Sequence, residues 1–394
     1  MMAALDEELR AELEWLDSAG LRRGLRMIES AHGPRVRRRG AELLMLSSND
    51  YLGLANHPQV RRAAIDAVER YGVGAGASRL IAGSMEPHHA LEDRVAELKG
   101  GQAALVFGSG YLANLGAITA LTGPADAVFS DELNHASLID GCRLSRAQVH
   151  IYRHRDCEHL AAMLARAGAF RRRLIVTDSV FSMDGDFAPL GAIVALARRF
   201  DAGVMIDEAH ALGVVGPDGR GLAAELDLEH EIEVQVGTLS KALGSYGAYV
   251  AGSRTLIELL VNRARSFIYS TGLAPAMAAA AQAAIRVMVA EPERRERLWR
   301  NASYLRAKLS AAGFTIGATQ SPITPVMAGE AETAVALARR LLDRGVYAIA
   351  IRPPTVPPHT ARLRLTPTSE HSHADLDFAA AALIESGREL GVIG

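Results

Sequence analysis

The sequence has little cysteine: its 394 residues include only Cys142 and Cys157. Two cysteines cannot form a disulfide framework, and neither lies in the CxxC spacing that is typical of a metal site. We therefore expect a protein of a reducing compartment, without a bound metal, that is stabilised by its hydrophobic core.

A strong net charge is also lacking, because 43 lysines and arginines nearly balance 45 acidic residues, for a formal charge of −2. This balance argues against nucleic acid or an anionic membrane as the main partner. Two short arginine clusters, at residues 35–40 and 170–174, each flank an expected strand. We interpret both clusters as solvated edges of the protein.

No segment has the pattern of a targeting signal or a membrane span. Residues 1–26 are acidic early and amphipathic, without the apolar centre of a signal peptide or the acid-poor character of a transit peptide. The most apolar stretch, residues 273–290, is rich in alanine and contains Gln282 and Arg286, which favours a buried helix. We therefore expect a soluble protein, located in the cytoplasm.

The middle of the chain alternates short apolar runs with helical patterns, which predicts an α/β fold with a mainly parallel sheet covered by helices on both faces. Polar side chains at the carboxyl ends of such strands are candidate ligand contacts. Helices are expected at 159–170 and 189–200. The expected strands are 103–108, 126–131, 148–152, 174–179, 203–208, 234–238 and 248–252.

From about residue 290 the pattern changes to that of a smaller α+β domain. A charged helix is expected at 291–313 and another helix at 331–345. A proline-rich loop at 351–360 precedes a strand at 361–366. The length suits two domains, and we divide the chain into an N-terminal helix and arm (1–50), a large domain (51–288) and a small domain (289–394).

Two charged residues at the ends of expected strands indicate chemistry. Asp207 ends an apolar strand, with His210 three residues later, and a carboxylate there is costly to bury unless it meets positive charge or donors. Lys241 follows the next strand, 34 residues after Asp207, among glycines, serines and small apolar residues. A lysine that forms a Schiff base with pyridoxal phosphate, and an aspartate that keeps the ring nitrogen protonated, would need these residue types. Asp207 could instead cap a helix, and the lysine could simply be solvated.

Ordered motifs along nearly the whole chain make the sequence resemble the α-oxoamine synthases. These are fold-type I pyridoxal-phosphate enzymes, similar in fold to aspartate aminotransferase, that condense an amino acid with an acyl thioester. The resemblance implies this fold, this cofactor and acyltransferase activity. The motifs that carry it include "LSSNDYLGL" (46–54), "GVGAGASRLIAGS" (72–84), "SGYLANLGAI" (109–118), "SDELNHASLIDG" (130–141), "DSVFSMDGD" (178–186), "IDEAHALGVVG" (206–216), "TLSKALG" (238–244), "FIYSTGLAP" (267–275) and "IRPPTVPPHTARLRLT" (351–366).

The resemblance also implies roles for single residues at the cofactor. Lys241 is the expected Schiff-base lysine, Asp207 the partner of the ring nitrogen, and His135 the imidazole stacked over the ring; we expect these three to be catalytic. The other implied contacts are Ser182 and His210 at the ring, Gly110, Tyr111 and Thr238 at the phosphate, and Ser270 and Thr271 at the phosphate across a homodimer interface.

At the substrates, the resemblance assigns Arg364 and Asn49 to the amino-acid carboxylate, for which a guanidinium fork is well shaped. His135 also faces the substrate, and Arg23 and Thr355 correspond to acyl-substrate contacts, with neighbouring Arg22 left open. Arg362 lies on the same strand face as Arg364, so alternation does not choose between them. Two departures from the family pattern are Asp178, where glutamate is frequent, and Ala211.

Within the family, the motifs at 351–366 look most like those of the member that joins L-alanine to a pimeloyl thioester in biotin biosynthesis. The alternative within the family is a glycine-using enzyme that makes 2-amino-3-oxobutyrate from acetyl-CoA. A more remote alternative is a non-catalytic regulator that binds pyridoxal phosphate. Such regulators usually carry an appended DNA-binding domain, for which this chain has no room.

Overall fold

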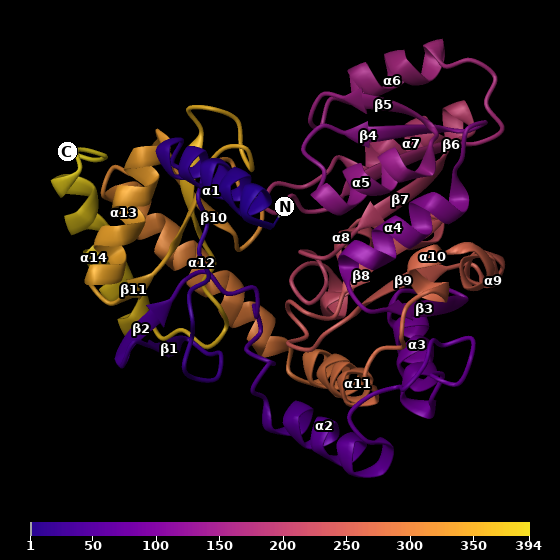
Figure 1. Cartoon of the computed structure of the whole chain (residues 1–394), viewed down its shortest axis with the longest axis horizontal. Helices are drawn as coiled ribbons and strands as arrows, with labels where there is room; N and C mark the ends of the chain where they lie inside the picture. Colours follow the sequence, from indigo (N-terminus) through magenta and orange to yellow (C-terminus); the bar gives the residue numbers. More distant parts are fainter. Residues whose placement is uncertain (1) are drawn as a thin grey trace.

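The computed structural model describes residues 2–394 and divides into two groups of elements (Figure 1). The larger group surrounds a seven-stranded sheet with the order β3-β9-β8-β7-β6-β4-β5. Neighbouring strands are parallel except in the two pairs that include β9, so the expected mainly parallel sheet is confirmed. The strands are β3 (Ala103–Phe107), β4 (Ala127–Asp131), β5 (Gln148–Tyr152), β6 (Arg173–Asp178), β7 (Gly203–Asp207), β8 (Val234–Thr238) and β9 (Ala248–Gly252).

Helices cover both faces of this sheet because neighbouring strand residues alternate between two cores. On β3, for example, Val106 belongs to one buried cluster and Leu105 to another. The apolar stretch predicted to be a buried helix forms α11, which packs against α2 and α3. The helices of this group are α2 (Pro58–Tyr71), α3 (Glu86–Leu98), α4 (Gly110–Leu121), α5 (Ala136–Ser145), α6 (Cys157–Arg166), α7 (Leu190–Phe200), α8 (Leu222–Glu225), α9 (Arg254–Arg263), α10 (Arg265–Ile268) and α11 (Pro275–Ala290), with 3-10 turns η1 (Pro217–Gly219) and η2 (Glu229–Glu231).

The smaller group joins the C-terminal quarter of the chain to a segment from its beginning. In Figure 1 the strands β1 and β2 lie beside the C-terminal elements, and β2 pairs in parallel with β11. Leu44 and Leu46 are buried in the same core as Leu363 and Leu383. Here lie α1 (Met2–Ser18), β1 (Arg35–Arg38), β2 (Ala41–Met45), α12 (Pro292–Ala311), β10 (Thr324–Gly329), α13 (Ala331–Asp343), β11 (Val346–Tyr347), β12 (Ile349–Ile351), β13 (Ala361–Leu365) and α14 (His373–Glu389).

The expected helix at 159–170 is shorter in the structure, where α6 ends at Arg166. Ala167 has an extended backbone, and Gly168 follows it, which has the lowest helix propensity after proline. Cys142 and Cys157 are both free thiols. Along residues 2–394, no helix combines the length and the apolar content that crossing a membrane requires.

Candidate active site

The predicted cofactor residues gather at one edge of the seven-stranded sheet. The strands β6, β7 and β8 end in Asp178, Asp207 and Thr238, and Lys241 follows β8. Because these strands are parallel, their carboxyl ends meet at the same edge, where α/β proteins bind ligands. A cavity of about 290 Å³ opens there, lined by Ser47, Asn49, His135, Ser182, Met183, His210, Lys241, Ile349, Ile351 and Arg364.

The amine of Lys241 is one end of a line of hydrogen bonds. Its Nζ lies 2.8 Å from Nε2 of His210, and Nδ1 of the same ring lies 2.8 Å from the hydroxyl of the buried Tyr51. Burial, with the nearby charge of Arg364, lowers the pKa of Lys241 to about 8, although Asp207 opposes the shift. Burial, with the charge of Lys241, also lowers the pKa of His210 well below its usual value. A fraction of the protein molecules therefore has a neutral, nucleophilic Lys241 amine near neutral pH.

Asp207 is buried but its carboxylate has partners. The Asn114 side chain donates to its Oδ2 at 2.7 Å, and the backbone N–H of Ala209 donates to its Oδ1 at 2.8 Å. Asn114 also donates to Ser137, whose hydroxyl lies 2.7 Å from Nδ1 of His135. The carboxylate and the imidazole predicted to contact the ring are thus joined by one hydrogen-bonded chain.

The predicted phosphate turn is the N-terminus of α4, which begins at Gly110 after the cap residue Ser109. The first N–H groups of a helix have no partner within it, and the helix dipole favours an anion there. A Cβ at Gly110 would lie 3.9 Å from Cβ of Thr238, so the turn and the end of β8 are adjacent. The Tyr111 side chain is exposed and donates to Asp140. Its backbone lies in the first turn of α4.

Arg364 is buried at the cavity wall. It donates to the Asn49 side-chain oxygen at 3.1 Å, to the Tyr51 hydroxyl at 3.2 Å and to the Ser182 carbonyl. The other candidate on β13, Arg362, instead pairs with Asp184 and donates to the Thr360 carbonyl. Only Arg364 lines the cavity, which agrees with its assignment to the substrate carboxylate.

Besides Asp207, Gly110, Tyr111 and Thr238, which are described above, four more predicted residues do not line this cavity in the single chain: Arg23, Ser270, Thr271 and Thr355. Arg23, Thr271 and Thr355 are exposed, and Ser270 is half-buried. The segment with Arg22 and Arg23 contacts the proline-rich loop, because Arg352 donates to the Arg22 carbonyl at 3.1 Å. These four residues remain predictions.

Small residues around Lys241 also have a packing role. Gly244 has φ 60°, and a Cβ there would lie 2.2 Å from the backbone nitrogen of Ala55. The lysine loop therefore rests directly on the backbone that follows the "NDYL" motif. This contact brings Tyr51 and Lys241 to opposite sides of His210.

A larger cavity, of about 730 Å³, lies at the opposite edge of the sheet. Its lining includes Arg173, Gly203 and Val234, which begin β6, β7 and β8. None of the predicted site residues lines it, so size alone would have selected the wrong edge.

Sequence reasoning missed Tyr51 and Asn114 as members of the site. Each lies inside or beside a motif that carried the resemblance, and each is polar and buried. Their partners are far away in sequence: Tyr51 contacts His210, and Asn114 contacts Asp207. A buried tyrosine or amide within a motif is the signal that could have suggested them.

Comparison with known proteins defines the class. Residues 41–383 match the family described as aminotransferase class I and II. A variant of the serine palmitoyltransferase of S. paucimobilis, solved with a bound PLP–myriocin aldimine, is 34% identical, covers both chains fully and superposes with a TM-score of 0.94. The chain therefore belongs to the class I and II aminotransferase family, and the expected fold-type I architecture is confirmed.

Within that class, similar curated proteins include several 8-amino-7-oxononanoate synthases. The protein of that name from Geobacter sulfurreducens is 52% identical over 99% of this chain and 100% of its own length. The one from Anaeromyxobacter dehalogenans is 54% identical over 95% and 94%. A solved 8-amino-7-oxononanoate synthase from Francisella tularensis, 25% identical, has a TM-score of 0.76 over 88% of this chain and 98% of its own. The resemblance to α-oxoamine synthases is thereby confirmed.

The family uses pyridoxal phosphate, and the residues present fit this cofactor. Lys241 offers an amine with a lowered pKa, Asp207 a buried carboxylate held by Asn114, and α4 a helix N-terminus beside Thr238. The buried Oδ1 of Asn114 has no hydrogen-bond partner among the described residues, which leaves this polar group free toward its surroundings. Pyridoxal phosphate is therefore the cofactor of this site.

Proposed function

We propose that this protein is an 8-amino-7-oxononanoate synthase, which joins L-alanine to a pimeloyl thioester and releases carbon dioxide and the free thiol carrier. The observation that carries the proposal is one cavity that holds both a buried carboxylate-binding group, Arg364, and a lysine amine, Lys241. The identity of about 50% to synthases of that name supports the choice of substrates.

When bound, pyridoxal phosphate supplies an electron sink for charge that develops at the amino-acid α-carbon. Lys241 would hold it covalently, and Asp207, fixed by Asn114, would keep a proton at the ring nitrogen. The N–H groups at the start of α4 and the Thr238 hydroxyl would bind the phosphate. His135, exposed in the single chain, offers a flat face that excludes water from the ring.

The substrate steps use the same residues. Arg364, with Asn49 beside it, binds the carboxylate of alanine. Once the alanine amine has replaced Lys241 at the cofactor, the freed Lys241 amine would remove the proton from the α-carbon. The α-carbon would then attack the thioester carbonyl and displace the thiol. The resulting β-keto acid loses carbon dioxide, and Lys241 returns a proton to the α-carbon. Arg23 and Thr355 would hold the acyl chain near the proline-rich loop.

We further propose a homodimer whose two subunits share each site. Ser270 and Thr271 do not line the cavity of their own chain, and the resemblance assigns them to phosphate contacts across a dimer interface. Thr271 forms an isolated β-bridge with Ser78, and large apolar side chains close in sequence to both residues are open to solvent. Tyr269 is 72% exposed and Ile81 81% exposed. Sedimentation should give twice the mass of one chain. The two free cysteines agree with a cytoplasmic location, which cell fractionation would test.

A substrate panel tests the function. Purified protein loaded with pyridoxal phosphate is offered alanine, glycine or serine, each with pimeloyl-CoA, acetyl-CoA or palmitoyl-CoA, and the products are identified by mass. We expect the 8-amino-7-oxononanoate mass with alanine and pimeloyl-CoA, at a rate at least about tenfold above the other pairs, or ~1.4 kcal/mol of discrimination. Faster reaction of glycine with acetyl-CoA, or of serine with palmitoyl-CoA, would overturn the proposal.

A further inference from the structure

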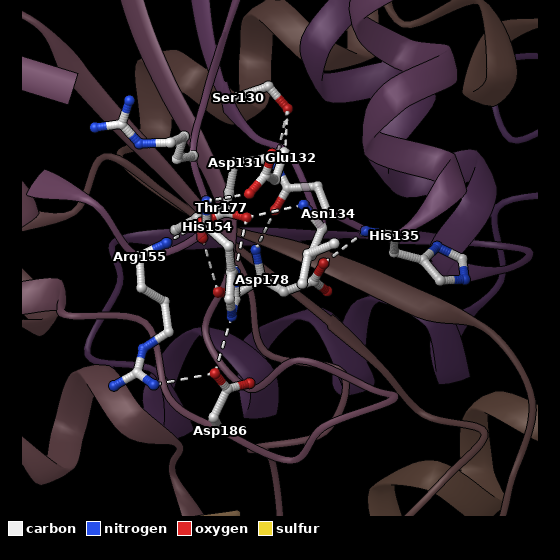
Figure 2. Close-up of polar contacts among 12 residues, drawn as sticks. Ser130, Asp131, Glu132, Asn134, His135, His154, Arg155, Thr177, Asp178 and Asp186 are labelled. Carbon is white, nitrogen blue, oxygen red and sulfur yellow. Dashed lines mark hydrogen bonds and ion pairs between the residues drawn. The ribbon is translucent and has the colours of Figure 1, made fainter. Parts of the chain in front are cut away.

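His154 lies between two buried carboxylates, Asp131 at the end of β4 and Asp186 in the loop at residues 180–187 that follows β6 (Figure 2). Its Nδ1 is 3.0 Å from Oδ1 of Asp131, and its Nε2 is 2.9 Å from Oδ2 of Asp186. Asp131 is 2% exposed and Asp186 6% exposed. Arg155 adds a second cation, donating to Asp186 at 3.1 Å through its guanidinium and to Asp131 at 2.9 Å through its backbone.

This geometry defines the charge of the imidazole. A neutral ring has one donor and one acceptor, so it can donate to both carboxylates only when both nitrogens are protonated. Burial disfavours the charge, but the hydrogen bonds to Asp131 and Asp186 outweigh it and raise the pKa of His154 to about 9. The other charged groups facing it are Glu132, which accepts from the His154 backbone, and Arg155.

Asp186 closes the loop that follows β6. Its carbonyl accepts from the Phe181 N–H at 3.0 Å, the Gly185 N–H donates to the Phe181 carbonyl at 2.8 Å, and Val180 bridges to Phe187. The buried Phe181 ring also meets the His154 ring edge-on, with centroids 4.4 Å apart. Thus His154 contacts this loop at both of its ends.

The tip of the same loop contacts the substrate arginine. The Ser182 carbonyl accepts from Nε of Arg364, and Asp184 pairs with Arg362. Because Nε is held by this carbonyl, the other two nitrogens of Arg364 are aimed at Asn49 and Tyr51, at the cavity wall. The position of the loop therefore sets the orientation of the guanidinium plane.

We infer that His154 is a positioning residue for amino-acid binding: held between Asp131 and Asp186, it fixes the 180–187 loop, and the loop orients Arg364 toward the substrate carboxylate. This inference rests on the proposed function. His154 does not line the cavity and acts only through the loop. Its removal should weaken alanine binding more than acyl-donor binding.

The test measures the apparent Kd of L-alanine from the absorbance change of the bound cofactor, which needs no turnover. His154→Gln should raise this Kd about tenfold at pH 7, the effect of losing roughly one hydrogen bond. The half-saturating pimeloyl-CoA concentration should stay within about twofold, since local effects on one site need not reach a distant one. His159→Gln is the matched control, because His159 bonds only within its own segment, to the Arg153 N–H.

A pH series separates positioning from a general structural defect. As the pH rises through about 9, wild-type His154 loses its charge, so the Kd ratio of His154→Gln to wild type should fall toward one. If His154→Gln does not fold, Asp186→Asn should show the same weakening of alanine binding. In addition, wild type and His159→Gln should both lose alanine affinity as the pH rises through about 9. A Kd ratio within twofold, or one constant with pH, would overturn the inference. No response of wild type to alanine would instead refute the proposed function.

Discussion

Lys241 has the most demanding task of any single residue, because its amine must be neutral to capture the cofactor. Its environment lowers the pKa to about 8, so roughly one amine in ten is neutral at pH 7. We expect the rate at which apoprotein captures pyridoxal phosphate to rise about tenfold between pH 7 and 9 and then level off. Stopped-flow absorbance measures this rate. A capture rate that keeps rising to pH 10.5 would mean that Lys241 has the pKa of an ordinary lysine. Lys241→Ala is the control, which should lack the absorbance band of the covalently bound cofactor.

Arg364 separates substrate binding from cofactor chemistry. Arg364→Ala should keep the colour of the bound cofactor but need roughly ten- to a hundred-fold more alanine for half-saturation, since a charged hydrogen-bonded pair contributes about 1.5–3 kcal/mol. Arg364→Lys should recover part of the loss, because an ammonium cannot form the bidentate fork. Alanine titration measures both variants.

Arg362→Ala is the control for that titration, because Arg362 pairs with Asp184 rather than lining the cavity. It should lose less alanine affinity than Arg364→Ala. A larger loss of alanine affinity in Arg362→Ala than in Arg364→Ala would mean that Arg362, two residues earlier on the same strand, binds the carboxylate.

At the scale of elements, the lysine loop depends on a backbone contact that side chains do not reveal. Gly244 has φ 60° and no room for a Cβ against Ala55. Gly244→Ala should therefore lower the free energy of unfolding by at least about 2 kcal/mol. Gly168→Ala, where a Cβ meets nothing within 4 Å, should change it by less than about 0.5 kcal/mol. Denaturant unfolding measures both, and equal effects would refute the packing explanation.

The elements themselves were largely predictable, for a physical reason. The strands at 234–238 and 248–252 match the structure residue for residue, because short apolar runs between turns have few other ways to be buried. The strand at 148–152 also matches, although it lies at the edge of the sheet with Val149 and Ile151 exposed. The end of α6 was not predicted correctly, because the position of a helix terminus depends on local capping. Lys241, Asp207 and Arg364 were found because motifs carry them. The roles of Tyr51, Asn114 and His154 depend on contacts with distant segments, which one sequence does not encode locally.

At the scale of the whole molecule, the site exists because two groups of elements meet. The large sheet supplies Lys241, Asp207 and His135, while the smaller group supplies Arg364 from β13. The N-terminal segment supplies Asn49 and Tyr51, which bridge the two. Amino-acid binding and cofactor chemistry therefore depend on separate parts of the fold, whose relative placement fixes the distance between carboxylate and amine.

The proposed reaction is a condensation in which alanine loses its carboxylate as carbon dioxide. The direct measurement is the release of labelled carbon dioxide from carboxyl-labelled L-alanine, alongside free CoA from pimeloyl-CoA, in the same reaction. We expect one carbon dioxide for each CoA, none without the acyl donor, and no detectable release of either in Lys241→Ala. Release of CoA with the label retained in the product would contradict it, because the enzyme would then transfer the acyl group without decarboxylation.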